Sequence, residues 1–167
     1  MDVRVRTMRP DDAEAIVNIL NPIITQGTYT LFDTPFSVES EREFLMQFPH
    51  RGVFHVAECC ETSHVCGFQN LEPFAAYTHA CDHVGIIATY IDRSFRRQGV
   101  GSRLAKATFT AARRKGYEKI FTYVRSDNPD ALQFYIRHGF RIIGTAQKQA
   151  KFGTTYVDEI LIEKFLS

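Results

Sequence analysis

Positive charge and small residues are concentrated between Arg96 and Arg103, where the sequence reads RRQGVGSR. Gly99 and Gly101 present backbone N–H groups without side chains that would keep a bulky anion away. An apolar strand-like run precedes this segment, and the residues after it have the spacing of a helix. The first N–H groups of a helix lack intrahelical partners and carry partial positive charge. Arginine, glycine and a helix start together favour a phosphate or pyrophosphate ligand.

Two common phosphate-binding patterns do not fit this segment. A dinucleotide-binding loop requires G-x-G-x-x-G, but Leu104 stands in the place of the third glycine. A nucleoside triphosphate loop requires G-x-x-x-x-G-K-[ST], and no Gly-Lys-Ser or Gly-Lys-Thr follows. The pattern that fits is Arg-x-x-Gly-x-Gly, placed after a strand and at the start of a helix. An ordinary helix start after a flexible turn is the simpler alternative for this segment taken alone.

A second pattern lies between Asn128 and Phe140. Ala131 and Tyr135 are four residues apart and share a helix face, so the small side chain leaves room beside the tyrosine. Asn128 stands at the start of this helix, where its amide can bond the backbone or a ligand. Taken without the first pattern, this one favours a capped amphipathic helix, ended by Gly139, whose tyrosine belongs to the core.

Hydrophobic periodicity indicates the elements that position these residues. Strands are expected over residues 3–8, 53–59, 65–71, 84–92, 119–125, 140–149 and 155–165. Helices are expected to begin at Pro10, Ser37, Gly99 and Asn128. The first helix is expected to bury Ile16, Ile19, Leu20 and Ile23, and the second Phe44, Leu45 and Phe48. The third is expected to carry Val100, Leu104, Ala107 and Ala111 on its buried face. The order β-α-α-β-β-β-α-β-α-β-β predicts one α/β domain over residues 1–167. Its sheet is expected to be largely antiparallel in the first half, with a β-α-β step around the glycine segment.

Composition excludes several classes of protein. The 167 residues are 44% hydrophobic and 23% charged, which suits one globular domain. A net charge of +1 argues against a general nucleic-acid binder, although residues 93–119 are locally basic. With no apolar run of membrane length and no secretory leader, a cytoplasmic protein without membrane contact is expected. Cys59, Cys60, His64 and Cys66 lack C-x-x-C spacing, so free thiols and no metal are expected.

Together, the two patterns resemble those of the GNAT superfamily of N-acetyltransferases. Arg96-x-x-Gly99-x-Gly101 is similar to the family's acyl-CoA pyrophosphate loop, and Asn128-x-x-Ala131-x-x-x-Tyr135-x-x-x-Gly139-Phe140 is similar to the helix after its fifth strand. The resemblance implies the GNAT fold, a mixed, mostly antiparallel sheet flanked by helices, with splayed central strands that hold acyl-CoA. Residues 3–166 further resemble the phosphinothricin acetyltransferase-like branch, which acetylates amino-acid-like amines. Resemblance to this branch implies a homodimer.

The resemblance implies direct transfer from acetyl-CoA, the cosubstrate, to an amine. Backbone groups of Thr89, Tyr90 and Ile91 would bond the pantetheine arm, and one N–H would hold the developing oxyanion. The implied pyrophosphate loop consists of Arg96, Arg97, Gln98, Gly99, Val100, Gly101 and Ser102. Asn128 would bond the cofactor arm. Tyr135 would lie near the sulfur and protonate the leaving thiolate.

The general base is the part of this mechanism that the sequence leaves open. The amine must be neutral to attack, so a base or a water chain is required at neutral pH. Relatives in this branch carry a glutamate three residues before the position of Thr89, where this chain has Ile86. The candidates in or near the preceding loop are Glu72, His79, Asp82 and His83. His83 is the predicted base, because its unperturbed pKa suits the role.

The acceptor is expected to be a small amine, with Phe32, Phe74 and Tyr77 lining its pocket, although core packing is their simpler explanation. A protein N-terminus or lysine is the alternative acceptor. An acyl-CoA-binding module without catalysis is the alternative function, which Ile86 favours and Tyr135 opposes. Ile160, Ile162 and Phe165 could form the surface of a homodimer, and burial in the core explains them equally well.

Overall fold

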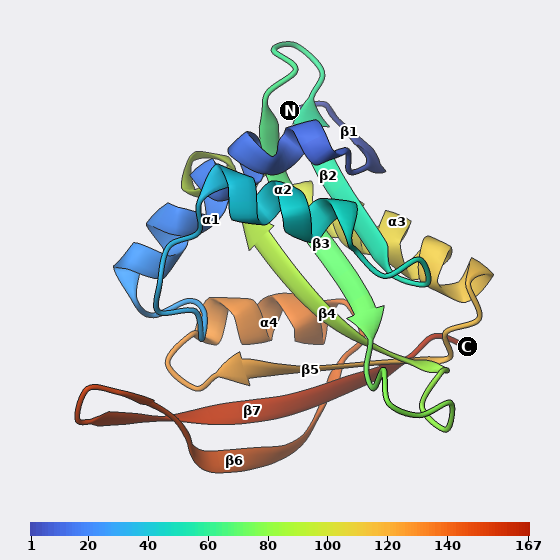
Figure 1. The fold of residues 1–167 in the computed structure, drawn as a ribbon. Helices are drawn as coiled ribbons and strands as arrows, with labels where there is room; N and C mark the ends of the chain where they lie inside the picture. The colour runs from blue at the N-terminus through green and yellow to red at the C-terminus, as the bar shows by residue number, and fades with distance from the viewer.

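The computed structural model describes all 167 residues, which form one seven-stranded sheet with helices on both faces (Figure 1). The strands are β1 (Val3–Thr7), β2 (Val53–Cys59), β3 (Val65–Pro73), β4 (Val84–Ile91), β5 (Lys119–Arg125), β6 (Arg141–Phe152) and β7 (Thr155–Phe165). The helices are α1 (Ala13–Gln26), α2 (Val38–Met46), α3 (Val100–Arg114) and α4 (Pro129–Arg137), with 3-10 turns η1 (Pro10–Asp12) and η2 (Arg93–Phe95). The predicted order of elements is confirmed.

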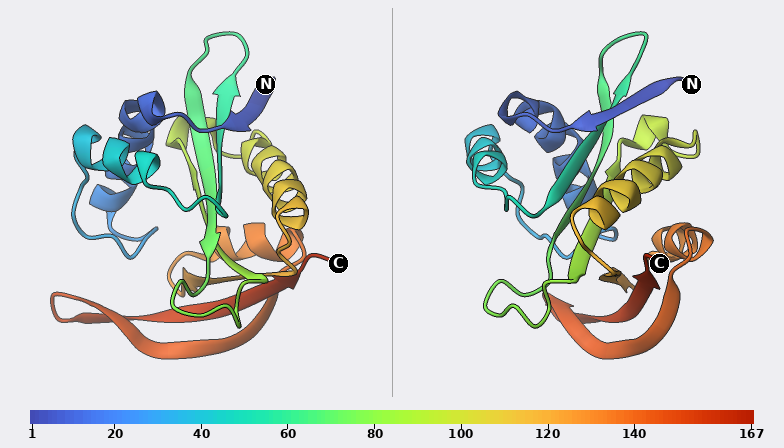
Figure 2. Two further views of the ribbon diagram at one scale, coloured as in Figure 1. Left: turned by 45° about the vertical axis from the view of Figure 1, so that its right-hand side comes forward. Right: turned by 90° about the vertical axis from the view of Figure 1, so that its right-hand side faces the viewer.

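The strand order in space is β1-β2-β3-β4-β5-β7-β6. All neighbouring strands are antiparallel except β4 and β5, which α3 connects as a parallel β-α-β unit. Figure 2 shows α1 and α2 on one face of the sheet and α3 and α4 on the other. The fold class expected from the sequence is therefore confirmed, including the antiparallel first half.

The two layers of helices bury two main hydrophobic clusters. On one face, Ile16, Leu20 and Leu45 pack with Phe54 and Phe68 of the sheet. On the other face, side chains of α3 and α4 pack on Ile87, Ile120 and Ile162, among others. This burial of aliphatic and aromatic side chains on both faces is the main source of stability.

The helix boundaries follow local signals, with two corrections. Ser37 caps α2 by accepting a hydrogen bond from the N–H of Ser40 at 3.1 Å, as predicted. The helix ends at Met46, two residues before the predicted end at Phe48. Phe44 was expected to face inward but is 39% exposed. The buried face of α3 consists of Val100, Leu104, Ala105, Thr108, Phe109 and Ala112. Ala107 and Ala111 lie only half-buried at its edge, because the large ring of Phe109 packs inward against Phe140.

The central strands diverge soon after they meet. β4 pairs with β5 only from Val84↔Lys119 to Ile86↔Phe121, whereas its pairing with β3 continues to Ile91. Just beyond the last pair, the carbonyl of Ile87 accepts a hydrogen bond from the hydroxyl of Thr122 at 2.8 Å. Figure 1 shows the widening angle between the two strands. The edge of β4 that faces β5 is thus open over residues 88–91.

β6 and β7 form a long hairpin at the lower edge of the sheet (Figure 2). Of the apolar residues considered for a dimer surface, Ile162 is fully buried in the core, whereas Phe165 is 54% exposed. All four cysteines are free thiols, and no group of three or more His, Cys, Asp and Glu side chains is arranged to hold a metal ion. None of the helices combines the length and the apolar character needed to span a membrane.

Candidate functional site

A cavity of about 990 Å³ fills the angle between β4 and β5. Its wall is formed by the C-terminal halves of both strands, the loop before α3 and the first turn of that helix, one side of α4, and the segment after α1. Two residues of β3 and one residue of β7 complete it. Every predicted cofactor-binding residue except Gln98 lies on this wall. The divergence of the strands therefore brings together groups that are remote in the sequence.

One end of the cavity presents free backbone donors. The first hydrogen bond of α3 runs from the N–H of Arg103 to the carbonyl of Gly99 at 3.2 Å. The N–H groups of Val100, Gly101 and Ser102 consequently have no acceptor within the helix. They open toward the cavity at the positive end of the helix dipole, which is suited to an anion.

The two glycines of this loop serve different purposes. Gly99 has φ of +81°, a left-handed conformation that other residues adopt only with strain, and a Cβ there would meet no atom within 4 Å. A Cβ on Gly101 would lie 2.8 Å from the Phe134 ring. Gly101 therefore permits the close approach of α3 to α4, and Gly99 permits the turn before α3.

Three arginines at this end take part in no ion pair with a carboxylate: Arg96, Arg97 and Arg137. The guanidinium of Arg96 lies over the ring of Tyr29 at 4.8 Å and donates to the carbonyl of Ile91 at 3.4 Å. Unpaired positive charge next to free N–H groups makes this end of the cavity electrostatically suited to a polyanionic group.

Tyr135 lies on the cavity wall in the middle of a hydrogen-bonded chain. Its hydroxyl is 2.9 Å from the hydroxyl of Thr89, which also accepts from the amide Nε2 of Gln69 at 2.8 Å. Because Gln69 supplies a proton to Thr89, the hydroxyl proton of Thr89 is free to be donated to Tyr135. The proton of Tyr135 is then available to the cavity. Burial raises the pKa of Tyr135, so the phenol is protonated at neutral pH.

Asn128 begins α4 at the same cavity. Its side-chain oxygen accepts a hydrogen bond from the N–H of Ala131 at 3.2 Å, which caps the helix as predicted. Only 7% of the residue is exposed. Capping uses the oxygen of the amide, so its NH₂ group remains able to donate to a ligand.

The far wall of the cavity carries a carboxyl group on β3. Glu72 pairs with Ile86 across the antiparallel β3–β4 ladder, so both side chains lie on the same face of the sheet. Both residues line the cavity. Burial raises the pKa of Glu72. Although Glu72 was expected in a loop, it belongs to β3, which extends to Pro73.

A second carboxyl group on the wall comes from β7. Glu159 is 1% exposed, and neither of its side-chain oxygens has a hydrogen-bond partner. Burial raises its pKa to about 7. The guanidinium of Arg125, opposite Glu159 on β5, forms two hydrogen bonds with Asp127 at 2.8 and 2.7 Å and a third with the carbonyl of Thr30 at 2.9 Å.

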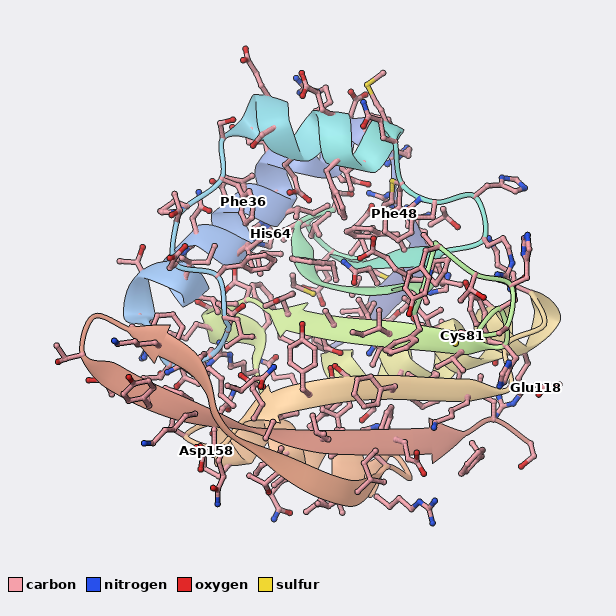
Figure 3. All side chains as sticks on the ribbon, turned by 60° about the horizontal axis from the view of Figure 1, so that its bottom comes forward. Phe36, Phe48, His64, Cys81, Glu118 and Asp158 are labelled. Carbon is pink, nitrogen blue, oxygen red and sulfur yellow. The ribbon has the colours of Figure 1, made fainter.

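The predicted base is not brought to the cavity. His83 is exposed, and its carbonyl accepts hydrogen bonds from the N–H groups of Glu118 and Lys119. The same loop contains Cys81, which Figure 3 shows at the same end of the sheet as Glu118 and away from Asp158. His79 and Asp82 bond each other at 2.9 Å and also lie outside the cavity wall. Among the four candidates, only Glu72 lines the cavity.

The three aromatic residues predicted for the acceptor pocket are also outside its wall. Phe32 packs edge-on against Phe36, and Phe74 packs edge-on against Phe121. Tyr77 is 90% exposed in the β3–β4 loop. Gln98 is directed away from the cavity, because its amide donates to the carbonyl of Ser94 at 3.1 Å.

The sequence interpretation missed several residues of the cavity. Thr30, Arg125 and Glu159 meet there from the segment after α1, from β5 and from β7. A glutamate among the apolar residues of a strand was the one available signal, because Glu159 stands between Val157 and Ile162 in the run VDEILI.

Comparisons with known proteins give a consistent result. Residues 18–140 match the family described as "Acetyltransferase (GNAT) family". The chain is 24% identical over 155 residues to the phosphinothricin N-acetyltransferase of Streptomyces coelicolor, covering 91% of this chain and 90% of that protein.

Solved structures show the same fold. An N-acetyltransferase from Staphylococcus aureus Mu50 superposes with a TM-score of 0.90 at 22% identity, covering 100% of both chains. A GNAT superfamily phosphinothricin acetyltransferase from Sinorhizobium meliloti, solved in complex with acetyl-CoA, superposes with a TM-score of 0.91 at 17% identity, covering 100% of this chain and 90% of that one.

Proposed function

The chain belongs to the GNAT acetyltransferase family, and we propose that it transfers the acetyl group of acetyl-CoA directly to the amine of a small molecule. The observation that carries this proposal is the cavity between β4 and β5. It joins free helix N–H groups and unpaired arginines at one end, through Tyr135, to the carboxyl group of Glu72 at the other. Relatives of the phosphinothricin acetyltransferase type support the same activity.

The end of the cavity at α3 fits the phosphates of acetyl-CoA. The N–H groups of Val100, Gly101 and Ser102 would hold the pyrophosphate, and the arginines Arg96 and Arg97 would neutralise its charge. The open edge of β4 over residues 88–91 leaves backbone groups for the amides of the pantetheine arm. Acetyl-CoA supplies the activated thioester, and this chain supplies position and proton transfer.

Glu72 replaces His83 as the proposed general base. The branch carries its glutamate at the position of Ile86, and Glu72 lies directly opposite on the same face of the sheet. A carboxyl group is thus present at this point of the cavity, although a different strand supplies it. Because burial raises its pKa, Glu72 is a stronger base than an exposed glutamate.

The proposed proton path has two ends. Glu72 takes the proton of the incoming ammonium, so that the neutral amine can attack the acetyl carbon. Tyr135 donates its hydroxyl proton to the sulfur as the carbon–sulfur bond breaks, and the Thr89 hydroxyl, 2.9 Å away, would then donate to the Tyr135 oxygen. The nitrogen becomes cationic on attack and releases its second proton as the tetrahedral intermediate collapses. Once Tyr135 is reprotonated, one proton in total has passed through Glu72 to solvent. The products are the N-acetyl compound and the free thiol of CoA.

The direct test is release of the free CoA thiol from acetyl-CoA with a panel of amines. The panel contains amino acids, methionine sulfone and sulfoximine, phosphinothricin, polyamines and short peptides. Turnover with small amines is the expected result, and turnover with peptides alone would favour a protein acceptor. Calorimetric binding of acetyl-CoA without turnover on any amine would favour a binding module that lacks catalysis.

We also propose a homodimer, as in the branch that the chain resembles. The exposed apolar residues Ile142 and Ile143 of β6 and Phe165 of β7 offer a surface for it. Light scattering of the purified protein measures the mass directly, and a monomer at micromolar concentration would refute this part of the proposal.

A further inference from the structure

Glu159 is a buried acid without a partner on the wall of the cavity. It is 1% exposed, and both of its oxygens lack a hydrogen bond. A buried polar group without a partner is costly, and native proteins seldom keep one without a reason. Because the side chain lines the cavity, a ligand in the cavity can supply the missing partner.

The nearest positive charge does not satisfy this acid. Arg125 is opposite Glu159 in the β5–β7 ladder, but its guanidinium is bonded twice to Asp127 and once to the carbonyl of Thr30. It also lies over the ring of Phe152 at 4.7 Å. Arg125 is therefore held in place and neutralised by Asp127, so it offers little charge to an acceptor carboxylate.

The acceptor side of the cavity is consequently acidic. Glu72 and Glu159 both line it, whereas the unpaired arginines Arg96, Arg97 and Arg137 lie with the loops and helix ends at its other side, together with one acid, Asp130 of the first turn of α4. The remaining polar residues toward the acceptor, Asn70, Thr30 and Tyr123, are uncharged. Such a wall favours a cation and disfavours an anion.

The two acids are too far apart to act on one nitrogen. Glu72 is level with Ile86 and Phe121, while Glu159 is level with Arg125, four residues further along β5. At about 3.3 Å per residue, this displacement amounts to roughly 13 Å along the strand. β4 and β5 also separate the strands that carry the two acids. The acids therefore mark two positions along an elongated ligand.

We propose that Glu159 binds a second, cationic nitrogen of the acceptor, and that the preferred acceptors are linear diamines or polyamines without a carboxylate. This inference rests on the proposed acetyl transfer and specifies its substrate class. Glu72 would act at the nitrogen that is acetylated, and Glu159 would form a charge-assisted hydrogen bond with the distant nitrogen. Residues from β3 and β7 would thus select acceptors by length and charge.

A matched set of amines tests the proposal. Pentylamine has one nitrogen, cadaverine adds a second at the same length, lysine adds a carboxylate to cadaverine, and spermidine is a longer polyamine. We expect kcat/KM to be highest for spermidine or cadaverine, and at least about tenfold lower for both pentylamine and lysine, as the loss of a charged hydrogen bond implies.

The variant Glu159→Gln identifies the residue responsible. It should raise KM for cadaverine and spermidine about tenfold or more, with kcat little changed, and leave the kinetics with pentylamine unaltered. Glu163→Gln is the matched control on the same strand, because Glu163 is paired with Lys119 and Arg141 and does not line the cavity. Thermal unfolding of both variants monitors their folding.

The outcomes separate the two proposals. An equal change of KM for monoamine and diamine in Glu159→Gln, or a preference of the wild type for lysine over cadaverine, would overturn the role of Glu159 while acetyl transfer stands. No thiol release with any amine would instead overturn the proposed function. Calorimetry adds an independent readout, since spermidine should bind the wild type in the presence of CoA and bind Glu159→Gln more weakly.

Discussion

Replacement of Glu72 by glutamine tests the proposed base most directly. Glutamine keeps the size of the side chain and its place on β3 but cannot accept a proton at neutral pH. The fold should tolerate the change, because Glu72 is half-buried and makes no ion pair, and burial already disfavours its charge. Thermal unfolding is expected to confirm an intact fold.

The size of the effect follows from the role. General-base catalysis typically contributes about 10²- to 10⁴-fold, so Glu72→Gln should lower kcat/KM by that factor. At about 1.4 kcal/mol per factor of ten, this is roughly 3–5 kcal/mol of transition-state stabilisation. KM for the acetyl donor should change little, since Glu72 lies away from the phosphate end of the cavity.

The register of the sheet provides a rescue experiment. Ile86 is directly opposite Glu72, and the Cβ atoms of such cross-strand pairs are about 4.5–5.5 Å apart. A carboxylate introduced by Ile86→Glu into the Glu72→Gln variant would reach the same part of the cavity. We expect the double variant to recover at least about tenfold of the lost kcat/KM.

The pH dependence has a defined sign. A base must be ionised, so the wild-type rate should fall as the pH falls through the pKa of Glu72. Burial raises that pKa, which moves the loss to higher pH than for an exposed glutamate. Dividing the wild-type rate by the Glu72→Gln rate at each pH removes the effect of amine protonation, which is the same in both assays. This ratio should decline toward low pH.

The assay is thiol release from acetyl-CoA with the best amine of the panel, and His83→Gln is its control. Because His83 lies outside the cavity wall, that variant should keep near wild-type activity. Wild-type kcat/KM in Glu72→Gln would refute the role of Glu72. Loss of activity in His83→Gln, without rescue of the double variant, would return the role to the histidine.

Three further variants test the rest of the site. Tyr135→Phe should lower kcat about 10²-fold or more with little effect on acetyl-CoA binding, and unchanged turnover would exclude the general-acid role. Gly99→Trp should abolish acetyl-CoA binding by calorimetry, at a strain of about 1–2 kcal/mol from its positive φ. It is a cleaner probe than Gly101→Trp, whose Cβ would also press on Phe134. Burial raises the pKa of Glu159 to about 7, so the folded protein holds the proton of Glu159 more tightly than the unfolded chain does. The stability that this proton contributes is full below the ordinary glutamate pKa of about 4.5 and is lost as the pH rises through 7. Glu159→Gln should therefore stabilise the free protein by up to about 3 kcal/mol at pH 8, and by little at pH 4, in denaturant unfolding; equal effects at both values would contradict the burial of an ionisable acid.

Much of the fold was predictable because its signals are local. Ser37 and Asn128 cap the helices that follow them through contacts three residues away. Gly99 adopts the conformation that few other residues tolerate, and it marks the start of α3. Periodicity then gave the order of elements. The face of α3 was predicted one position off, because Phe109 could be placed inward only by its partners on other elements.

The sequence by itself predicted the proposed phosphate end of the cavity, because one continuous segment supplies both glycines, Arg96, Arg97 and the helix start. Tertiary structure decided the acceptor end. The register of β3 against β4 brings Glu72 to the place of the missing glutamate, and the β5–β7 pairing brings Glu159 to the cavity while Asp127 occupies Arg125. The two strand pairings join residues that are 14 and 34 positions apart, and their register depends on packing across the whole sheet.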